Sequence, residues 1–192
     1  YYSVYIILVL GIFIMSNASN IFGKEIKLGT SEFLLTRPIS RSTVYFTKVW
    51  DIIVMLIISA GLQTLLSAIG IFAFKGETTV SWKAFVYMQI HGFSVLFFLA
   101  MVGILVIMFT NPRKNKMGLT IGAIFGWYLI YILPKLSEKT EWISYFSPFR
   151  YVESTPTDPA FSLKYWGVLG LLAAGTLIIF LCKPRFEKMD VV

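Results

Sequence analysis

Charged residues are scarce in this chain of 192 residues, where they make up 14% of the total while hydrophobic residues make up 57%. A water-soluble domain of this size carries charge on about a quarter of its residues to cover its surface. The low charge, together with apolar runs long enough to cross a bilayer, excludes a water-soluble domain and a disordered segment. The chain is therefore expected to be an integral membrane protein.

Cysteine and histidine are almost absent. Cys182 has no second cysteine with which to form an intramolecular disulfide, and His91 is the single histidine, so no zinc-ligand spacing occurs. The chain also has no Gly-x-x-x-x-Gly-Lys-Ser/Thr phosphate loop, no His-Glu-x-x-His and no Gly-x-Ser-x-Gly motif. We therefore expect that the chain is not an enzyme by itself and that it holds no metal or cofactor of its own.

Five apolar stretches are long enough to cross a membrane, since a hydrocarbon core of about 30 Å takes about 20 helical residues. They cover residues 1–21, 49–74, 84–110, 117–133 and 165–182. Helices are expected because an unclosed sheet would leave backbone groups unsatisfied in lipid. The sequence predicts an all-α integral membrane protein, with residues 1–192 forming a single transmembrane domain built as a polytopic helix bundle.

The basic residues fall mostly in the segments 22–48, 111–116 and 183–192, and fewer lie in 75–83 and 134–164. By the positive-inside rule the first group is cytoplasmic, so residues 22–48 form a cytoplasmic loop and residues 134–164 an outer loop. An odd number of spans with an external start predicts one further helix before Tyr1, and six in the full chain. The net charge of +7 is thus a signal of topology, and no nucleic-acid partner is expected. The expected location is a cell membrane, with multiple passes, and specifically a bacterial plasma membrane.

The cytoplasmic loop contains a predicted short helix between two breaks. Gly29 interrupts the chain, Thr30 can cap the next helix, and Glu32 complements its amino-terminal dipole. Pro38 disfavours the helical conformation at Arg37 and so ends the helix. On composition alone this helix either lies in the lipid headgroups or docks on a protein partner through an apolar patch flanked by charge. The patch consists of Phe33, Leu34 and Leu35.

An ordered series of residues in this loop resembles the corresponding loop of the type-2 ATP-binding-cassette exporter permeases. The series is Glu25, Gly29, Thr30, Glu32, Leu34, Leu35, Pro38, Ser40, Arg41 and Lys48. A Ser-Pro-Phe-Arg-Tyr segment at 147–151 and a short tail containing Phe186 extend the resemblance.

The resemblance implies that residues 23–36 form a coupling helix, which docks in a groove of a separate ATP-binding-cassette ATPase subunit. ATP and Mg would be bound by that ATPase, and a second permease copy or homologue would complete the transporter. The residues that the resemblance assigns to ATPase coupling are Glu25, Gly29, Thr30, Glu32, Phe33, Leu34, Leu35, Arg37, Pro38 and Arg41.

Two further sets of residues stand out in the spans. Asn17, Asn20, Gln63 and Thr64 are polar, and they either line a substrate pathway or bond between helices, with the second favoured. Gly118, Gly122 and Gly126 form a double Gly-x-x-x-Gly ridge, which is typical of close helix packing within one chain or across a dimer.

The expected function is that of a permease subunit in an ATP-driven exporter, which moves a hydrophobic or amphipathic substrate out of the cytoplasm by alternating access. A drug, a peptide and a lipid all remain open as the substrate, and besides its protein partners the chain contacts membrane lipid. The alternative is a non-transporting membrane scaffold or immunity protein that binds a peptide.

Overall fold

The structure, a computed structural model, describes residues 2–28, 40–74, 81–110, 117–135, 138–152 and 165–188. Its long helices are α1 (Tyr2–Leu28), α3 (Arg41–Phe74), α4 (Trp82–Phe109), α5 (Met117–Ile132) and α6 (Tyr165–Lys188). Short 3-10 helices η1 (Leu133–Lys135), η2 (Glu138–Phe146) and η3 (Pro148–Val152) follow α5. No strand occurs in the described ranges, and the prediction of an all-helical bundle is confirmed.

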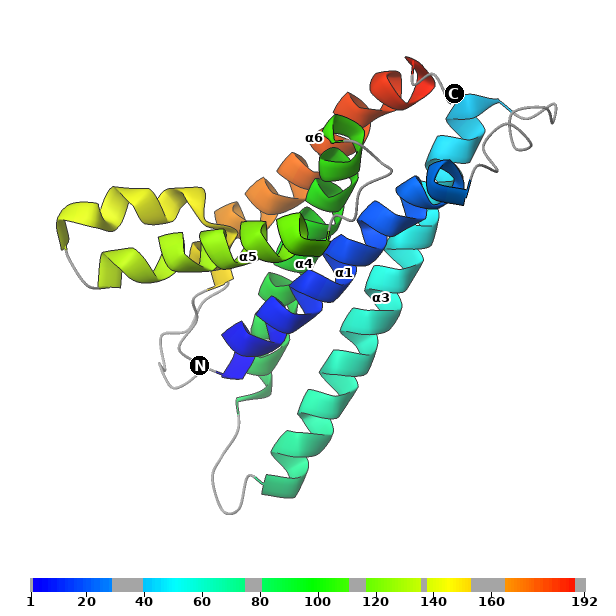
Figure 1. The fold of residues 1–192 in the computed structure, drawn as a ribbon. Coiled ribbons are helices and arrows are strands. Elements are labelled where there is room, and N and C mark those ends of the chain that lie inside the picture. The colour runs from blue at the N-terminus through cyan, green and yellow to red at the C-terminus, as the bar shows by residue number, and fades with distance from the viewer. Residues whose placement is uncertain are drawn as a thin grey trace.

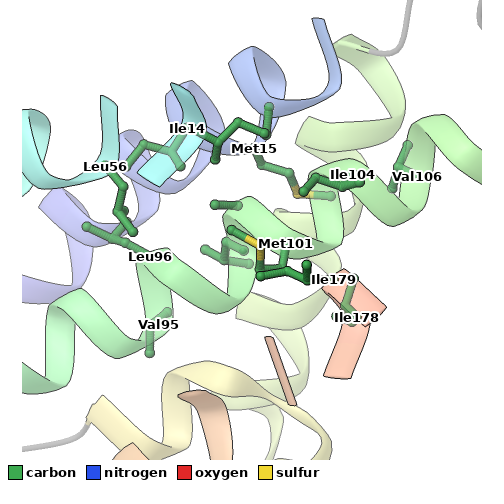
Figure 2. Packing of buried hydrophobic residues seen from close by; sticks show 14 of the residues in the cluster. Ile14, Met15, Leu56, Val95, Leu96, Met101, Ile104, Val106, Ile178 and Ile179 are labelled. Carbon is green, nitrogen blue, oxygen red and sulfur yellow. The ribbon is translucent and has the colours of Figure 1, made fainter. Parts of the chain in front are cut away.

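Helix α4 lies at the centre of the bundle, with α1 and α6 packed along it, while α5 and η2 run away from the bundle as a pair (Figure 1). The core is mostly apolar, with a few buried polar side chains such as Ser19, His91 and Ser94. Figure 2 shows Ile14 and Met15 of α1, Leu56 of α3 and Met101 and Ile104 of α4 converging on one cluster. Helix α4 carries apolar residues around its whole circumference, and this allows other helices to pack against it on several sides.

The backbones of α1 and α4 approach each other closely at Gly103. A Cβ atom at this position would lie 2.6 Å from the carbonyl oxygen of Met15, so only glycine allows this approach. The Ser19 hydroxyl donates a hydrogen bond of 2.8 Å to the Gly103 carbonyl oxygen at the same crossing. Gly175 of α6 plays the same part beside Phe97 of α4, where a Cβ atom would lie 2.6 Å from the ring.

Four of the described helices are long and apolar enough to cross a membrane, which indicates a multi-pass membrane protein. They are α1, α3, α4 and α6. The fifth predicted span, 117–133, corresponds to α5, which has 16 residues and falls short of the roughly 20 that a full crossing needs. The predicted count of five spans is therefore not reached within the described ranges, because η1 with Pro134 ends the α-helical geometry early.

The predicted cytoplasmic loop 22–48 includes the ends of two helices. Helix α1 continues to Leu28, and α3 begins at Arg41, well before the predicted start of the second span at Val49. Ser40 caps α3, since its hydroxyl oxygen accepts a 3.1 Å hydrogen bond from the Thr43 backbone N–H. The predicted outer loop 134–164 likewise contains η2 and η3. The spans were defined by hydrophobicity alone, whereas α1 and α3 continue beyond the apolar residues of their spans.

Candidate functional site

The helices that flank segment 29–39 meet α6 at one end of the bundle, which we call the basic end because it carries Lys24, Arg41, Lys48, Lys183, Arg185 and Lys188. Three rings from three helices form an aromatic junction there: Phe22 of α1, Tyr45 of α3 and Phe186 of α6. The centroids of Phe22 and Tyr45 are 5.5 Å apart, and that of Phe186 lies 5.7 Å from Phe22 and 5.4 Å from Tyr45. Phe22 and Tyr45 are fully buried, so this is a packed junction and not a surface cluster.

Two hydrogen bonds fix α3 to its neighbours at the aromatic junction. The Tyr45 hydroxyl donates a 2.6 Å bond to the Ile179 carbonyl oxygen of α6. The Lys48 ammonium donates a 2.7 Å bond to the Ile21 carbonyl oxygen of α1, and its nitrogen lies 5.6 Å from the centre of the Phe22 ring. The aliphatic part of the Lys48 side chain is thus buried, while its ammonium group contacts a carbonyl oxygen and the face of an aromatic ring.

The first turn of α3 also holds the last turn of α6. Arg41 donates a 2.7 Å hydrogen bond to the backbone carbonyl oxygen of Glu187, and the Ser42 hydroxyl donates a 2.5 Å bond to the Glu187 carboxylate. The same carboxylate lies 3.8 Å from the Lys183 ammonium. Both helices that flank residues 29–39 are therefore joined to α6, α3 through these bonds and α1 through the ring contact between Phe22 and Phe186.

Chemically, the aromatic junction consists of packed rings and of hydrogen bonds that join α1, α3 and α6. Within the described ranges no group of His, Cys, Asp or Glu residues is arranged to hold a metal ion. Cys182, the one thiol, is buried beneath the junction. The contacts at the junction thus connect α1, α3 and α6.

Most of the predicted coupling residues lie outside the described ranges. These are Gly29, Thr30, Glu32, Phe33, Leu34, Leu35, Arg37 and Pro38. Glu25 belongs to the last turns of α1, and Arg41 is the first residue of α3. Arg41 is thus the one predicted coupling residue whose side chain is described, and it contacts α6.

The four polar residues proposed to line a pathway do not form one track. The bond from Lys48 to Ile21 sets α1 and α3 in register, and from that level Asn17 and Gln63 lie roughly 16 Å apart along the helix axes. The Asn17 amide bonds to the Phe13 carbonyl of its own helix. The Gln63 amide bonds to Ser67, and the Thr64 hydroxyl donates a 3.2 Å bond to the Gln89 side chain of α4. Asn20 is exposed, near the basic end.

The glycine ridge of α5 has no close neighbour. A Cβ atom at Gly118, Gly122 or Gly126 would meet nothing within 4 Å among the residues that the structure describes. Packing of this ridge against another described helix of the same chain is therefore not seen, and packing across a dimer stays a prediction.

The opposite end of the bundle carries a cleft of about 330 Å³ between η2, η3, α4 and α6. Tyr151 closes one side, and a Cβ atom at Gly167 would lie 3.0 Å from its ring. Arg150 braces η2, because its guanidinium lies 3.5 Å from the Glu141 carboxylate and 3.7 Å above the Tyr145 ring. The remaining lining is mostly apolar: Phe98, Tyr145, Phe146, Ser147, Pro148, Trp166, Gly170, Leu171 and Ala174.

Sequence analysis missed the contacts of Tyr45 and Glu187. Tyr45 is separated from Phe186 by most of the chain, and no local pattern pairs them. One signal was present, since Tyr45, Lys48, Ile52 and Leu56 recur at helical spacing and mark one buried face of α3. That spacing identifies the face but not the helix that covers it.

A family model described as "Protein of unknown function (DUF2705)" matches residues 1–192. This family is not an ATP-binding-cassette permease family, so the assignment made from the loop residues is wrong. A glycine break, an acidic first turn, leucines and a proline are what any short helix at a membrane surface uses, which explains the resemblance without common family membership. Comparison with curated proteins and with solved structures gives no match. Over its whole length, the chain belongs to the DUF2705 family.

Proposed function

We propose that this protein is the membrane subunit of an ATP-driven exporter complex, in which it moves a hydrophobic or amphipathic substrate out of a bacterial cell. A drug, a peptide and a lipid each satisfy that description. Energy comes from a separate ATPase subunit, which carries ATP and Mg and docks on the predicted coupling segment, residues 23–36. Support for the proposal comes from the contacts of the helices that flank residues 29–39.

The observation that carries the proposal is the aromatic junction together with its hydrogen bonds. A partner that binds the predicted coupling segment can move several helices of the bundle only if the helices that flank residues 29–39 are joined to their neighbours. Tyr45 and Lys48 connect α3 to α6 and to α1, so a push on the segment reaches three of the four membrane-length helices. An arrangement of this kind favours a subunit that is driven from outside over one that only anchors in lipid.

Two further features support an assembly of two copies. Helix α3 presents an extended apolar surface beyond Leu56, and the glycine ridge of α5 has no close neighbour in the described chain. Both surfaces suit contact with a second membrane-spanning chain, because small residues and apolar faces let helices approach closely in lipid.

The proposal is tested by affinity purification of the tagged full-length protein in mild detergent, followed by an ATP-hydrolysis assay. A stoichiometric ATPase partner is expected to copurify. The charge reversal Glu32→Arg is expected to remove this partner while membrane insertion stays intact, because it reverses the charge at the predicted docking helix.

The matched control is Glu77→Arg, the same reversal in the segment between α3 and α4, which the predicted topology puts on the other side of the membrane. It is expected to retain the ATPase. Equal copurification with both variants would contradict the docking proposal. A protein that purifies alone and without ATP turnover would instead favour the scaffold or immunity function, for which the cleft beside Tyr151 offers an apolar peptide site.

A further inference from the structure

A groove of about 580 Å³ lies at the basic end, where α4 ends beside the last turns of α6. It is separate from the aromatic junction. The groove combines apolar walls with two cations, and its lining consists of Met108, Thr110, Leu181, Pro184, Arg185 and Lys188.

The Arg185 guanidinium is held by one hydrogen bond, and its other N–H groups make none within the described ranges. Its Nε donates a 2.8 Å hydrogen bond to the Met108 carbonyl oxygen at the end of α4, and it lies 4.5 Å from the centre of the Phe109 ring. Within the described ranges its two terminal nitrogens make no hydrogen bond, so their N–H groups remain available to an acceptor. These groups form the fork that recognises phosphate oxygens.

A second cation stands one turn further along α6. Lys188 is exposed and lines the same groove. The neighbouring carboxylate of Glu187 is held by Ser42 and Lys183 at the aromatic junction. Within the part of the chain that the structure describes, the groove therefore has a net positive charge. The sequence adds Arg113, Lys114 and Lys116 soon after Thr110.

The membrane side of the groove continues as an apolar stripe. Leu177 and Leu181 precede Arg185 by eight and four residues, and this helical spacing puts all three on one face of α6. The two leucines are 58% and 60% exposed. The face is thus cationic at its end and apolar for the next two turns towards the membrane, which matches the shape of a phospholipid.

We propose that this groove binds an anionic phospholipid, with the phosphate between Arg185 and Lys188 and an acyl chain along Leu181 and Leu177. Basic grooves between helices on the cytoplasmic side are suited to acidic headgroups. The predicted topology puts the groove on that side. This proposal is independent of the exporter function.

The test uses the full chain and phosphatidylglycerol as the probe, with phosphatidylcholine as the neutral comparison. Binding is measured by titrating each lipid into the detergent-solubilised protein and counting bound molecules by native mass spectrometry. Phosphatidylglycerol is expected to bind the wild type more tightly than phosphatidylcholine. Lys188→Gln is expected to weaken phosphatidylglycerol binding about fivefold, the effect of one cation near a membrane surface.

Lys83→Gln is the matched control, because Lys83 lies at the other end of α4 beside the Tyr87 ring. It is expected to leave the affinity unchanged. Arg185→Lys retains the charge but loses the fork, and is expected to weaken binding less than Arg185→Gln does. Equal affinity for the two lipids, or equal effects of Lys188→Gln and Lys83→Gln, would overturn the proposal. Displacement of the lipid by glycerol phosphate at a similar concentration would also overturn it, since the site would then recognise a free phosphate.

Discussion

The two halves of α3 differ sharply although both are apolar. All the fully buried residues of the helix, from Tyr45 to Leu56, lie in its first half, beside α1 and α6. In the second half, a Cβ atom at Gly61 or Gly70 would meet nothing within 4 Å, and large side chains such as Leu66 are 66% exposed. The helix is anchored at one end and presents the rest of its surface to its surroundings.

The difference follows from how the apolar residues are arranged. In the first half, polar residues such as Ser42, Thr47 and Asp51 alternate with an apolar stripe, so one face is selected for burial. In the second half, Gln63, Thr64 and Ser67 form a half-buried polar stripe with one hydrogen bond to α4, and the apolar residues on the other sides are exposed, where lipid would solvate them as well as protein does. Hydrophobicity therefore does not specify a contact inside a membrane, whereas an amphipathic stripe does.

Tyr45→Ala is expected to have the largest effect on stability. It empties a fully buried ring site between Phe22 and Phe186, and such a truncation costs about 3–5 kcal/mol. The measurement is unfolding of the purified protein in mixed micelles by added dodecyl sulfate, followed by circular dichroism. Leu62→Ala, in the second half of α3 where the side chain is 56% exposed, is the control and is expected to change little. Equal losses from the two variants would remove the distinction between the halves.

The variants Gly103→Ala and Gly61→Ala compare a packed helix crossing with the open second half of α3, and each adds a single methyl group. At Gly103 the new Cβ would lie 2.6 Å from the Met15 carbonyl oxygen, and relieving this clash is expected to cost about 1–3 kcal/mol. At Gly61 the space is open, and alanine is expected to stabilise the helix by up to about 1 kcal/mol. Opposite signs in the same unfolding assay are the predicted outcome. A loss at both positions would mean that the second half of α3 is packed.

Thr64→Val tests the polar link between the second half of α3 and α4, and is expected to have the smallest effect. The change removes, at nearly constant volume, the 3.2 Å hydrogen bond to Gln89 and the 2.8 Å bond that the same hydroxyl donates to the Ala60 carbonyl oxygen of its own helix. Bonds between helices in membranes contribute about 0.6 kcal/mol. A double-mutant cycle with Gln89→Leu isolates the pair. Strict additivity of the two changes would show that the bond contributes nothing measurable.

Length and hydropathy alone were enough to predict a helical membrane protein, and they located all five long helices. The helical spacing of Tyr45, Lys48 and Ile52 could have identified the buried face of α3, but this prediction was not made. The junction with Phe186 was beyond prediction, since it joins residues far apart in the chain through packing. The loop motif led to the wrong family because capping residues, an acidic first turn and a terminating proline are typical of short helices in general. Such residues therefore occur in unrelated families.

The length of α3 has a consequence for what stabilises the basic end. At 1.5 Å per residue its 34 residues extend about 51 Å, and the uncharged stretch after the exposed Asp51 covers about 34 Å, which is already enough for the hydrocarbon layer. Measured along α3, Tyr45 then lies about 10 Å before that stretch begins, while its hydrogen-bond partner Ile179 lies near the end of the apolar part of α6. We therefore expect the aromatic junction at the edge of the hydrocarbon layer, where the exclusion of water contributes to the packing of its rings. Urea, which acts from the aqueous phase, is expected to loosen this junction while the spans remain helical.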